Sequence, residues 1–120
     1  MEKSHAIAAL AALAQESRLD IFRLLVQAGK RGEPVSGIGA RLGLPSATLS
    51  FHLSQLRHAD LVSFRREGRS LIYTANFAVM NDLLGYLSEN CCAADSAGCD
   101  LAATTCNAGQ PEPAPAGETG

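Results

Sequence analysis

The sequence predicts a mainly α-helical domain that carries a single β-hairpin ahead of its last helix. Apolar residues recur at the spacing of helices in most segments between residues 2 and 87. Two short runs instead alternate apolar and polar residues around a glycine-containing turn. A chain of 120 residues with 47% hydrophobic side chains can build one ordinary core but is too short for two domains.

Two helices are expected near the N-terminus. The first spans residues 2 to about 14, where large apolar residues recur among alanines. Its apolar seam consists of Ile7, Leu10 and Leu13. An alanine-rich helix lets a second helix approach closely, so packing or dimerisation is the expected role of this seam. Ser17 is expected to cap the second helix, and Gly29 should end it after about Ala28.

The next two helices follow each other closely. Residues 35–42 form the expected third helix, and Gly43 should end it. Pro45 suits the start of a fourth helix that continues to about His58. Its inward-facing residues are expected to be Leu49, Leu53 and Leu56. Two helices joined by a short turn that contains glycine form the helix-turn-helix pattern.

A β-hairpin and a final helix complete the predicted domain. Residues 61–65 and 70–74 are the expected strands, and Gly68 lies in the turn between them. Helical spacing then resumes over residues 77–87. This order of elements predicts a winged helix-turn-helix domain with an added terminal helix.

The expected organisation has three parts. Residues 1–90 form the folded domain, residues 91–106 carry every cysteine, and residues 107–120 hold too little apolar surface to fold and are expected to be disordered. Charge is distributed unevenly as well. Residues 91–120 contain four acids and no basic residue, whereas residues 41–69 contain five arginines against two acids. The second of these is a modest basic patch that is compatible with nucleic acid.

The cysteines are gathered at one end of the chain, and they are Cys91, Cys92, Cys99 and Cys106. No apolar run approaches the ~20 residues of a membrane span, and no basic-then-apolar leader stands at the N-terminus. The protein is therefore expected to be cytoplasmic, without a membrane partner. Thiols stay reduced in that compartment, and clustered thiols there more often bind metals or sense redox state than form structural disulfides. Gathered thiolates suit a soft ion.

Three segments resemble the ArsR family of metalloid- and metal-responsive repressors. They are residues 16–25 (ESRLDIFRLL), residues 42–61 (LGLPSATLSFHLSQLRHADL) and residues 66–74 (REGRSLIYT). In order, they resemble the second helix, the recognition region and the wing of that family, and the resemblance covers about residues 5–88. It implies a homodimer, built on the first and last helices, that covers double-stranded operator DNA until a ligand releases it.

The resemblance and the physics of the motif together indicate which residues contact DNA. A recognition helix enters the major groove with its exposed N-terminal residues at the base edges, and arginines at a wing tip suit phosphate or minor-groove contact. The expected residues are Ser46, Thr48, Ser50, Phe51, His52, Gln55, Arg65, Arg66 and Arg69. Capping or packing is the alternative role for Thr48, and His52 could instead link the helix to the core. For the others, the alternative is an ordinary solvated surface.

The cysteines resemble those of an arsenic-responsive subgroup of the family, in which a vicinal pair is followed by a third cysteine. Cys91, Cys92 and Cys99 match that pattern, and Cys106 exceeds it without an assigned role. Trivalent arsenic and antimony take three thiolates in a pyramid, and the residues between Cys92 and Cys99 give the chain ample length to return. Methylarsenite needs only two thiolates. A zinc site, a redox-sensing thiol and incidental cysteines are the alternatives.

The expected function is a transcriptional repressor that trivalent arsenic or antimony releases from its operator. An intracellular metalloid carrier that does not act on DNA is the alternative from another class, and salt-dependent binding to duplex DNA would separate the two. Zinc- or redox-responsive repression would use the same fold. An enzyme is not expected, because the sequence has no phosphate loop, nucleophile elbow or acid–base constellation.

Overall fold

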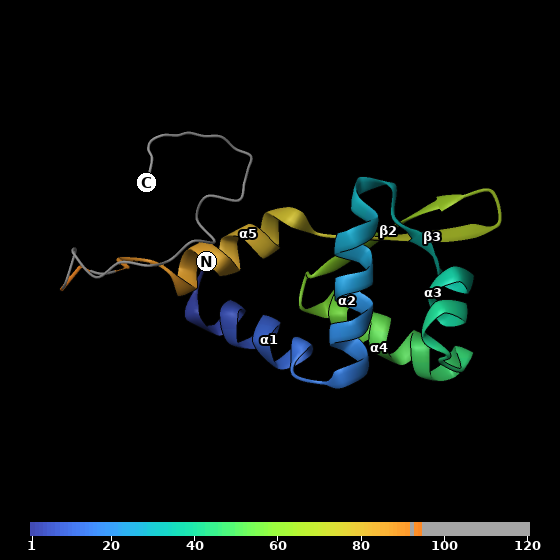
Figure 1. Ribbon diagram of the computed structural model, residues 1–120, viewed down its shortest axis with the longest axis horizontal. Coiled ribbons are helices and arrows are strands. Elements are labelled where there is room, and N and C mark those ends of the chain that lie inside the picture. The colour runs from blue at the N-terminus through green and yellow to red at the C-terminus, as the bar shows by residue number, and fades with distance from the viewer. Residues whose placement is uncertain (92, 95–120) are drawn as a thin grey trace. The chain divides into compact units, whose positions relative to one another are not determined.

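The computed structural model describes residues 1–91, 93 and 94 of the chain, and residues Met1–Leu87 form one compact unit (Figure 1). Five α-helices, one short 3₁₀ helix and three strands make up the described elements of that unit. In chain order they are α1 (Lys3–Leu13), α2 (Glu16–Ala28), η1 (Gly29–Arg31), β1 (Glu33–Pro34), α3 (Val35–Leu42), α4 (Ser46–His58), β2 (Val62–Glu67), β3 (Ser70–Ala75) and α5 (Phe77–Leu87).

The helices confirm the expected order, and α3, α4 and α5 have the expected bounds. Gly43 ends α3 in the left-handed conformation, with φ of 66°. A glycine without Cβ adopts this conformation at little cost. Pro45 stands just before α4 in an extended conformation, so it begins the helix from outside rather than within its first turn.

The expectation that Ser17 caps the second helix is wrong. Gln15 is the N-cap residue of α2, and its side-chain oxygen accepts a hydrogen bond from the backbone N–H of Arg18 at 2.9 Å. Ser17 already lies inside the first turn of the helix. Gln15 thereby satisfies one of the backbone donors that every helix leaves unpaired at its start.

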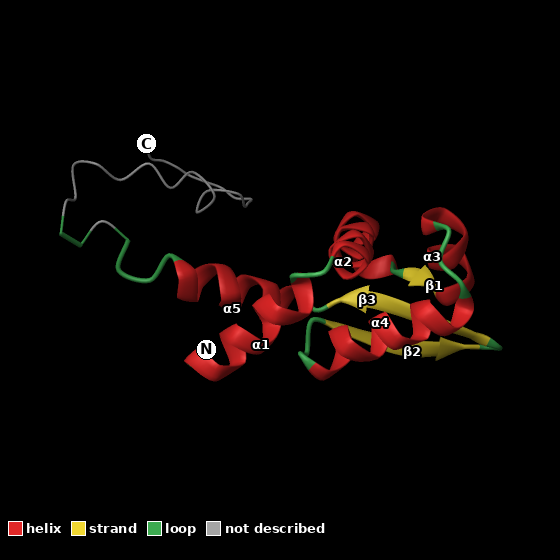
Figure 2. Cartoon of the chain, turned by 90° about the horizontal axis from the view of Figure 1, so that it is seen from below, coloured by secondary structure: helices red, strands yellow, loops and turns green. Residues whose placement is uncertain are grey.

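The hairpin is longer than expected and carries a third strand. β2 and β3 pair antiparallel from Val62 opposite Ala75 to Glu67 opposite Ser70, so only Gly68 and Arg69 form the turn. β1 pairs with the other edge of β3, which gives the sheet order β1-β3-β2. This two-residue strand had no periodic signal of its own in the sequence. α2 packs against β3 and α4 against β2 (Figure 2).

The core lies between these helices and the sheet. Its largest fully buried side chains are Ile21, Leu25, Ile38, Leu56 and Leu61. The inward residues expected for α4 (Leu49, Leu53 and Leu56) are buried as well. None of the helices in the described part of the chain combines the length and hydrophobicity that a bilayer span requires.

The first helix packs through its alanines. Ala6, Ala9 and Ala12 are buried, while Ile7 and Leu10 are 58% and 41% exposed. The small alanine face brings α1 close to the core and leaves the larger apolar side chains pointing outward. On α5, Leu83 is buried, whereas Leu84 and Leu87 are 50% and 58% exposed. Figures 1 and 2 both place α1 and α5 at one end of the unit, and α3 and the hairpin turn at the other.

Candidate nucleic-acid interface

The N-terminal half of α4 presents a continuous uncharged surface. Ser46, Ala47, Thr48, Ser50 and Phe51 are exposed, and Leu49 is the buried residue among them. Further along the helix Gln55 is half-buried. The helix contains no acidic residue, so nothing on α4 itself would repel a phosphate backbone. The sequence and structure thus agree on which face of α4 is exposed.

The start of α4 also presents backbone donors. The first hydrogen bond of the helix runs from the Leu49 N–H to the Pro45 carbonyl at 2.9 Å, so the N–H groups of Ser46, Ala47 and Thr48 precede the ladder. Pro45 makes no side-chain cap. Exposed N–H groups and the positive end of the helix dipole favour an anion at this position. Thr48 is exposed and inside the helix, so it neither caps nor packs there.

A hollow of about 610 Å³ is lined by α3, the start of α4 and the hairpin. Ser46 lines it from α4, and Arg69 and Ser70 line it from the hairpin turn and β3. Arg66 and Arg69 are exposed, and neither has an acidic partner among the residues that the structure describes. Two arginines of the hairpin are therefore available for an external anion, and one of them faces the same hollow as the start of α4.

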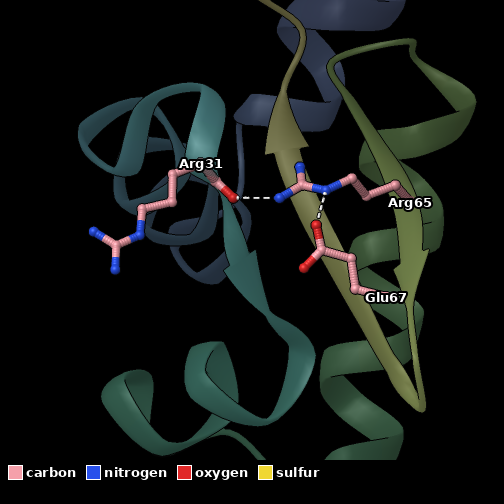
Figure 3. Close-up of polar contacts among 3 residues, drawn as sticks. All are labelled: Arg31, Arg65 and Glu67. Atoms are coloured by element: carbon pink, nitrogen blue, oxygen red, sulfur yellow. Dashed lines mark hydrogen bonds and ion pairs between the residues drawn. The ribbon is translucent and has the colours of Figure 1, made fainter.

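The exposed side chain of Arg65 is engaged in hydrogen bonds to other residues of the protein, as Figure 3 shows. Its Nε donates to Glu67 Oε2 at 2.7 Å, and its Nη2 donates to the Arg31 carbonyl at 2.8 Å. These bonds tie β2 to η1 across the neighbouring strand. Its charge is shared with Glu67, which makes Arg65 a weaker phosphate ligand than Arg66 or Arg69.

His52 is set apart from the other expected DNA-contacting residues because its side chain is buried, at 8% exposure. Its Nδ1 lies 3.3 Å from Nη1 of Arg18, whose Nε donates to the carbonyl of Ala12 at 2.7 Å. Arg18 always carries its protons, so His52 Nδ1 is the acceptor in this contact. Arg18 thus joins the end of α1 to the middle of α4. Of the two roles expected for His52, the geometry favours linking the helix to the core.

The buried position of His52 makes stability depend on pH. Burial lowers the pKa of His52 below its ordinary value of 6.5, and the Arg18 guanidinium lowers it further. Below pH 6.5 the His52 side chain therefore takes up a proton in the unfolded chain but not in the folded chain. The contribution of neutral His52 to the free energy of unfolding is complete above pH 6.5 and declines as the pH falls toward its pKa in the folded protein.

We expect the free energy of unfolding to decrease as the pH falls below 6.5, with His52 contributing to the slope. Denaturant titrations of the wild type and of His52→Gln at several pH values measure this contribution. The glutamine keeps a side-chain acceptor but does not titrate. The slope of the free energy of unfolding against pH should therefore be shallower in the variant than in the wild type. Equal slopes in the two proteins would show that His52 does not titrate differently on folding.

The expected cysteine site falls largely outside the described residues. Cys91 is described and exposed, and its backbone N–H donates to the Ser88 carbonyl at 2.9 Å. Cys92, Cys99 and Cys106 lie outside the described residues. Within the residues that are described, no three His, Cys, Asp or Glu side chains are grouped so that they could hold a metal ion.

Sequence reasoning missed two contacts that support this surface. One is the contact of Arg18 with His52, between residues 34 positions apart. The other is the guanidinium of Arg57, which lies 5.3 Å from the ring centroid of Phe64 and ties the end of α4 to β2. Arg18 in α2 and Phe64 in β2 are visible in the sequence as a charged and an aromatic residue. Helical periodicity, however, does not tell which residues of different elements contact each other.

The three-helix core, the exposed face of α4 and the arginine-bearing hairpin define a winged helix-turn-helix domain. A helix-turn-helix domain family matches residues 13–63. The nodulation protein NolR of Rhizobium meliloti is 36% identical over 80 residues, which is 67% of this chain and 63% of NolR. The matched region therefore spans less than two thirds of this relative's own length.

Two solved structures have the same fold. An ArsR-like transcriptional regulator from Rhodococcus sp. RHA1 is 27% identical with a TM-score of 0.63, over 71% of this chain and 77% of that one. A homodimeric winged helix-turn-helix DNA-binding domain from Mycobacterium bovis, described as a possible ArsR-family regulator, is 29% identical with a TM-score of 0.56, over 71% and 83%. The chain is therefore a winged helix-turn-helix domain that is similar to ArsR-like regulators.

Proposed function

We propose that the protein is a transcriptional repressor that binds operator DNA as a homodimer and is released by trivalent arsenic or antimony. One observation supports DNA binding above all others. Ser46 at the start of the acid-free helix α4 and Arg69 of the hairpin, which has no acidic partner among the described residues, line one hollow.

The geometry suits one way of docking on a duplex. The exposed residues of α4 enter the major groove, and the hairpin follows the backbone toward the adjacent minor groove. The hollow between Ser46 and Arg69 then accommodates the sugar-phosphate backbone that separates the two grooves. Backbone N–H groups at the start of α4 and the guanidinium of Arg69 would bind phosphate oxygens, which positions the helix without reading sequence.

Dimerisation uses the opposite end of the domain. Ile7 and Leu10 on α1 and Leu84 and Leu87 on α5 expose large apolar side chains, and α1 packs beside α5. An apolar groove of about 430 Å³, lined in part by Leu13 and Leu84, extends from this area. A two-fold axis through these helices would leave both copies of α4 outward. The homodimeric state of the Mycobacterium bovis domain supports dimerisation itself.

The inducer is assigned from the donor chemistry of the cysteines. Cys91 is exposed four residues after the end of α5, and Cys92 and Cys99 follow it in the sequence. Three thiolates suit a soft trivalent ion better than oxygen ligands would. Because the cysteines begin next to the proposed dimer helix, gathering them around an ion can favour a dimer that no longer spans two half-sites. The ligand must prefer that state, since equal affinity for both would shift nothing.

Wing contact with phosphate is tested by Arg69→Ala. Losing one phosphate contact in each protomer should weaken binding to all duplexes and reduce the slope of log K against log salt by about 0.9 per contact, or roughly 2 per dimer. Fluorescence anisotropy at a series of salt concentrations measures the slope.

Arg23→Ala is the matched control for that experiment. Arg23 is an exposed arginine of α2 that lines the apolar groove by α5 rather than the hollow by α4. Its loss changes the net charge equally, so it should leave the salt slope nearly intact. If Arg69→Ala and Arg23→Ala had the same slope, the hairpin would not contact phosphate. Duplex binding with no salt dependence in the wild type would contradict the repressor function itself.

A further inference from the structure

Phe51 is the one large apolar side chain on the exposed half of α4. It is 56% exposed, and it lies in the middle of the surface that the proposed function places in the major groove. Its neighbours three and four residues away on the same helix face are Ala47, Thr48, Ser54 and Gln55. Three of the four are small, so most of the exposed ring of Phe51 is not covered by side chains of its own helix.

The ring is also supported from beneath. The centroids of Phe51 and His52 are 5.5 Å apart with an interplanar angle of 60°, a tilted aromatic contact. His52 is in turn buried and held at its Nδ1 by Arg18. A ring that packs against a fixed neighbour on one side and is open on the other is prepared for a contact without losing much rotational freedom.

The chemistry of the groove indicates what this ring can contact. A phenyl ring has no hydrogen-bond donor or acceptor, so it cannot read the polar edges of bases. In DNA without modified bases, the apolar group that the bases display in the major groove is the C5-methyl group of thymine. Contact with it removes apolar surface of both partners from water. Isolated apolar residues on a surface often have no role, but this one lies on the face that enters the groove.

We propose that Phe51 is a specificity residue that contacts the C5-methyl group of one thymine in each operator half-site. The inference rests on the proposed function, because it requires α4 to lie in the major groove. It extends that function by naming a base feature that the protein selects and the residue that selects it. Ser50 and Gln55 remain the candidates for hydrogen-bond readout beside it.

Deoxyuridine substitution isolates this contact. The probe is a duplex selected by the wild-type protein from a pool with a randomised core, in which each thymidine is replaced in turn by deoxyuridine. Deoxyuridine keeps the base pair and the O4 acceptor and lacks the methyl group alone. One position in each half-site should show a loss of about fourfold, as expected for one buried carbon, and the doubly substituted duplex about 15-fold.

The variant Phe51→Ala should bind the thymidine and deoxyuridine duplexes equally. Its side chain is exposed, so the fold should persist, and an unchanged Tm verifies this. Phe51→Leu should keep part of the preference, because leucine retains apolar surface. Gln55→Ala is the matched control on the same helix, and it should weaken binding while the ratio between the two duplexes stays that of the wild type.

Two results would overturn the assignment of Phe51. The wild type could bind all deoxyuridine duplexes as well as the parent duplex, or the loss could persist unchanged in Phe51→Ala. In either case salt-dependent binding to the parent duplex would still support the repressor function. Failure to select any duplex would instead contradict the proposed function, so the two failures are distinguishable.

Discussion

The Leu10→Glu variant is expected to be a folded monomer that binds operator DNA poorly. Leu10 is 41% exposed in the single chain, so the glutamate can remain hydrated there. In the dimer it would place an uncompensated charge in an apolar interface, at a cost of about 3–5 kcal/mol. Two copies of each substitution enter a two-fold interface. The dimer dissociation constant should therefore rise at least ~100-fold, which sedimentation velocity measures over a concentration series.

Ala8→Glu is the matched control for this substitution. Ala8 is exposed on the same helix, but residues two positions apart on a helix do not share a face. This variant should remain dimeric and bind DNA as the wild type does. If Leu10→Glu formed a dimer with unchanged affinity, the assignment of α1 to the interface would be wrong. The exposed leucines of α5 would then be tested in the same way.

Replacing any one of Cys91, Cys92 and Cys99 by serine is expected to abolish release of DNA by arsenite. In the wild type, a coupling of ~1–3 kcal/mol would weaken operator binding about 5- to 150-fold. A serine hydroxyl does not replace a thiolate as a ligand for a soft ion. Cys106→Ser should be nearly silent, because three thiolates already satisfy a pyramidal ion. Titration of the protein–operator complex with arsenite measures release for each variant.

The cysteine variants should bind operator DNA normally when no inducer is present, which separates sensing from binding. If Cys99→Ser still released DNA at the wild-type arsenite concentration, a two-thiolate site at Cys91 and Cys92 would replace the three-thiolate site. If release required zinc or an oxidant and not arsenite or antimonite, the proposed inducer would be wrong while the repressor function remained.

Local signals account for what the sequence predicted well. Gly43 and Pro45 end one helix and begin the next through their backbone preferences alone, so the helix-turn-helix bounds followed from two residues. The exposed face of α4 followed from the helical spacing of its buried leucines. The resemblance to a known family was equally local, since each of its segments lies within one or two elements.

The features that sequence reasoning missed depend on contacts between distant residues. Strand β1 exists because Glu33 and Pro34 pair with Tyr73 and Ile72. A pattern of two residues is too short to predict a strand. The contact of Arg18 with His52 likewise arises only when α2 packs against α4. The Ser17 prediction failed for another reason, because the helix begins at Glu16 and Gln15 caps it by accepting from the Arg18 N–H, so Ser17 lies inside the first turn. The cysteine site remains a prediction from sequence, since Cys92 and Cys99 lie outside the described residues.

The proposed homodimer is tested most directly by locating its two α4 helices on one duplex. Hydroxyl-radical footprinting of the wild-type protein on its selected duplex would locate every protected sugar. A dimer with outward α4 helices should protect two symmetry-related stretches about one helical turn apart, roughly 10–10.5 base pairs between centres. The same pattern should disappear at high salt as counterions compete for the phosphates. A single protected stretch without symmetry, or protection that survives high salt, would contradict it.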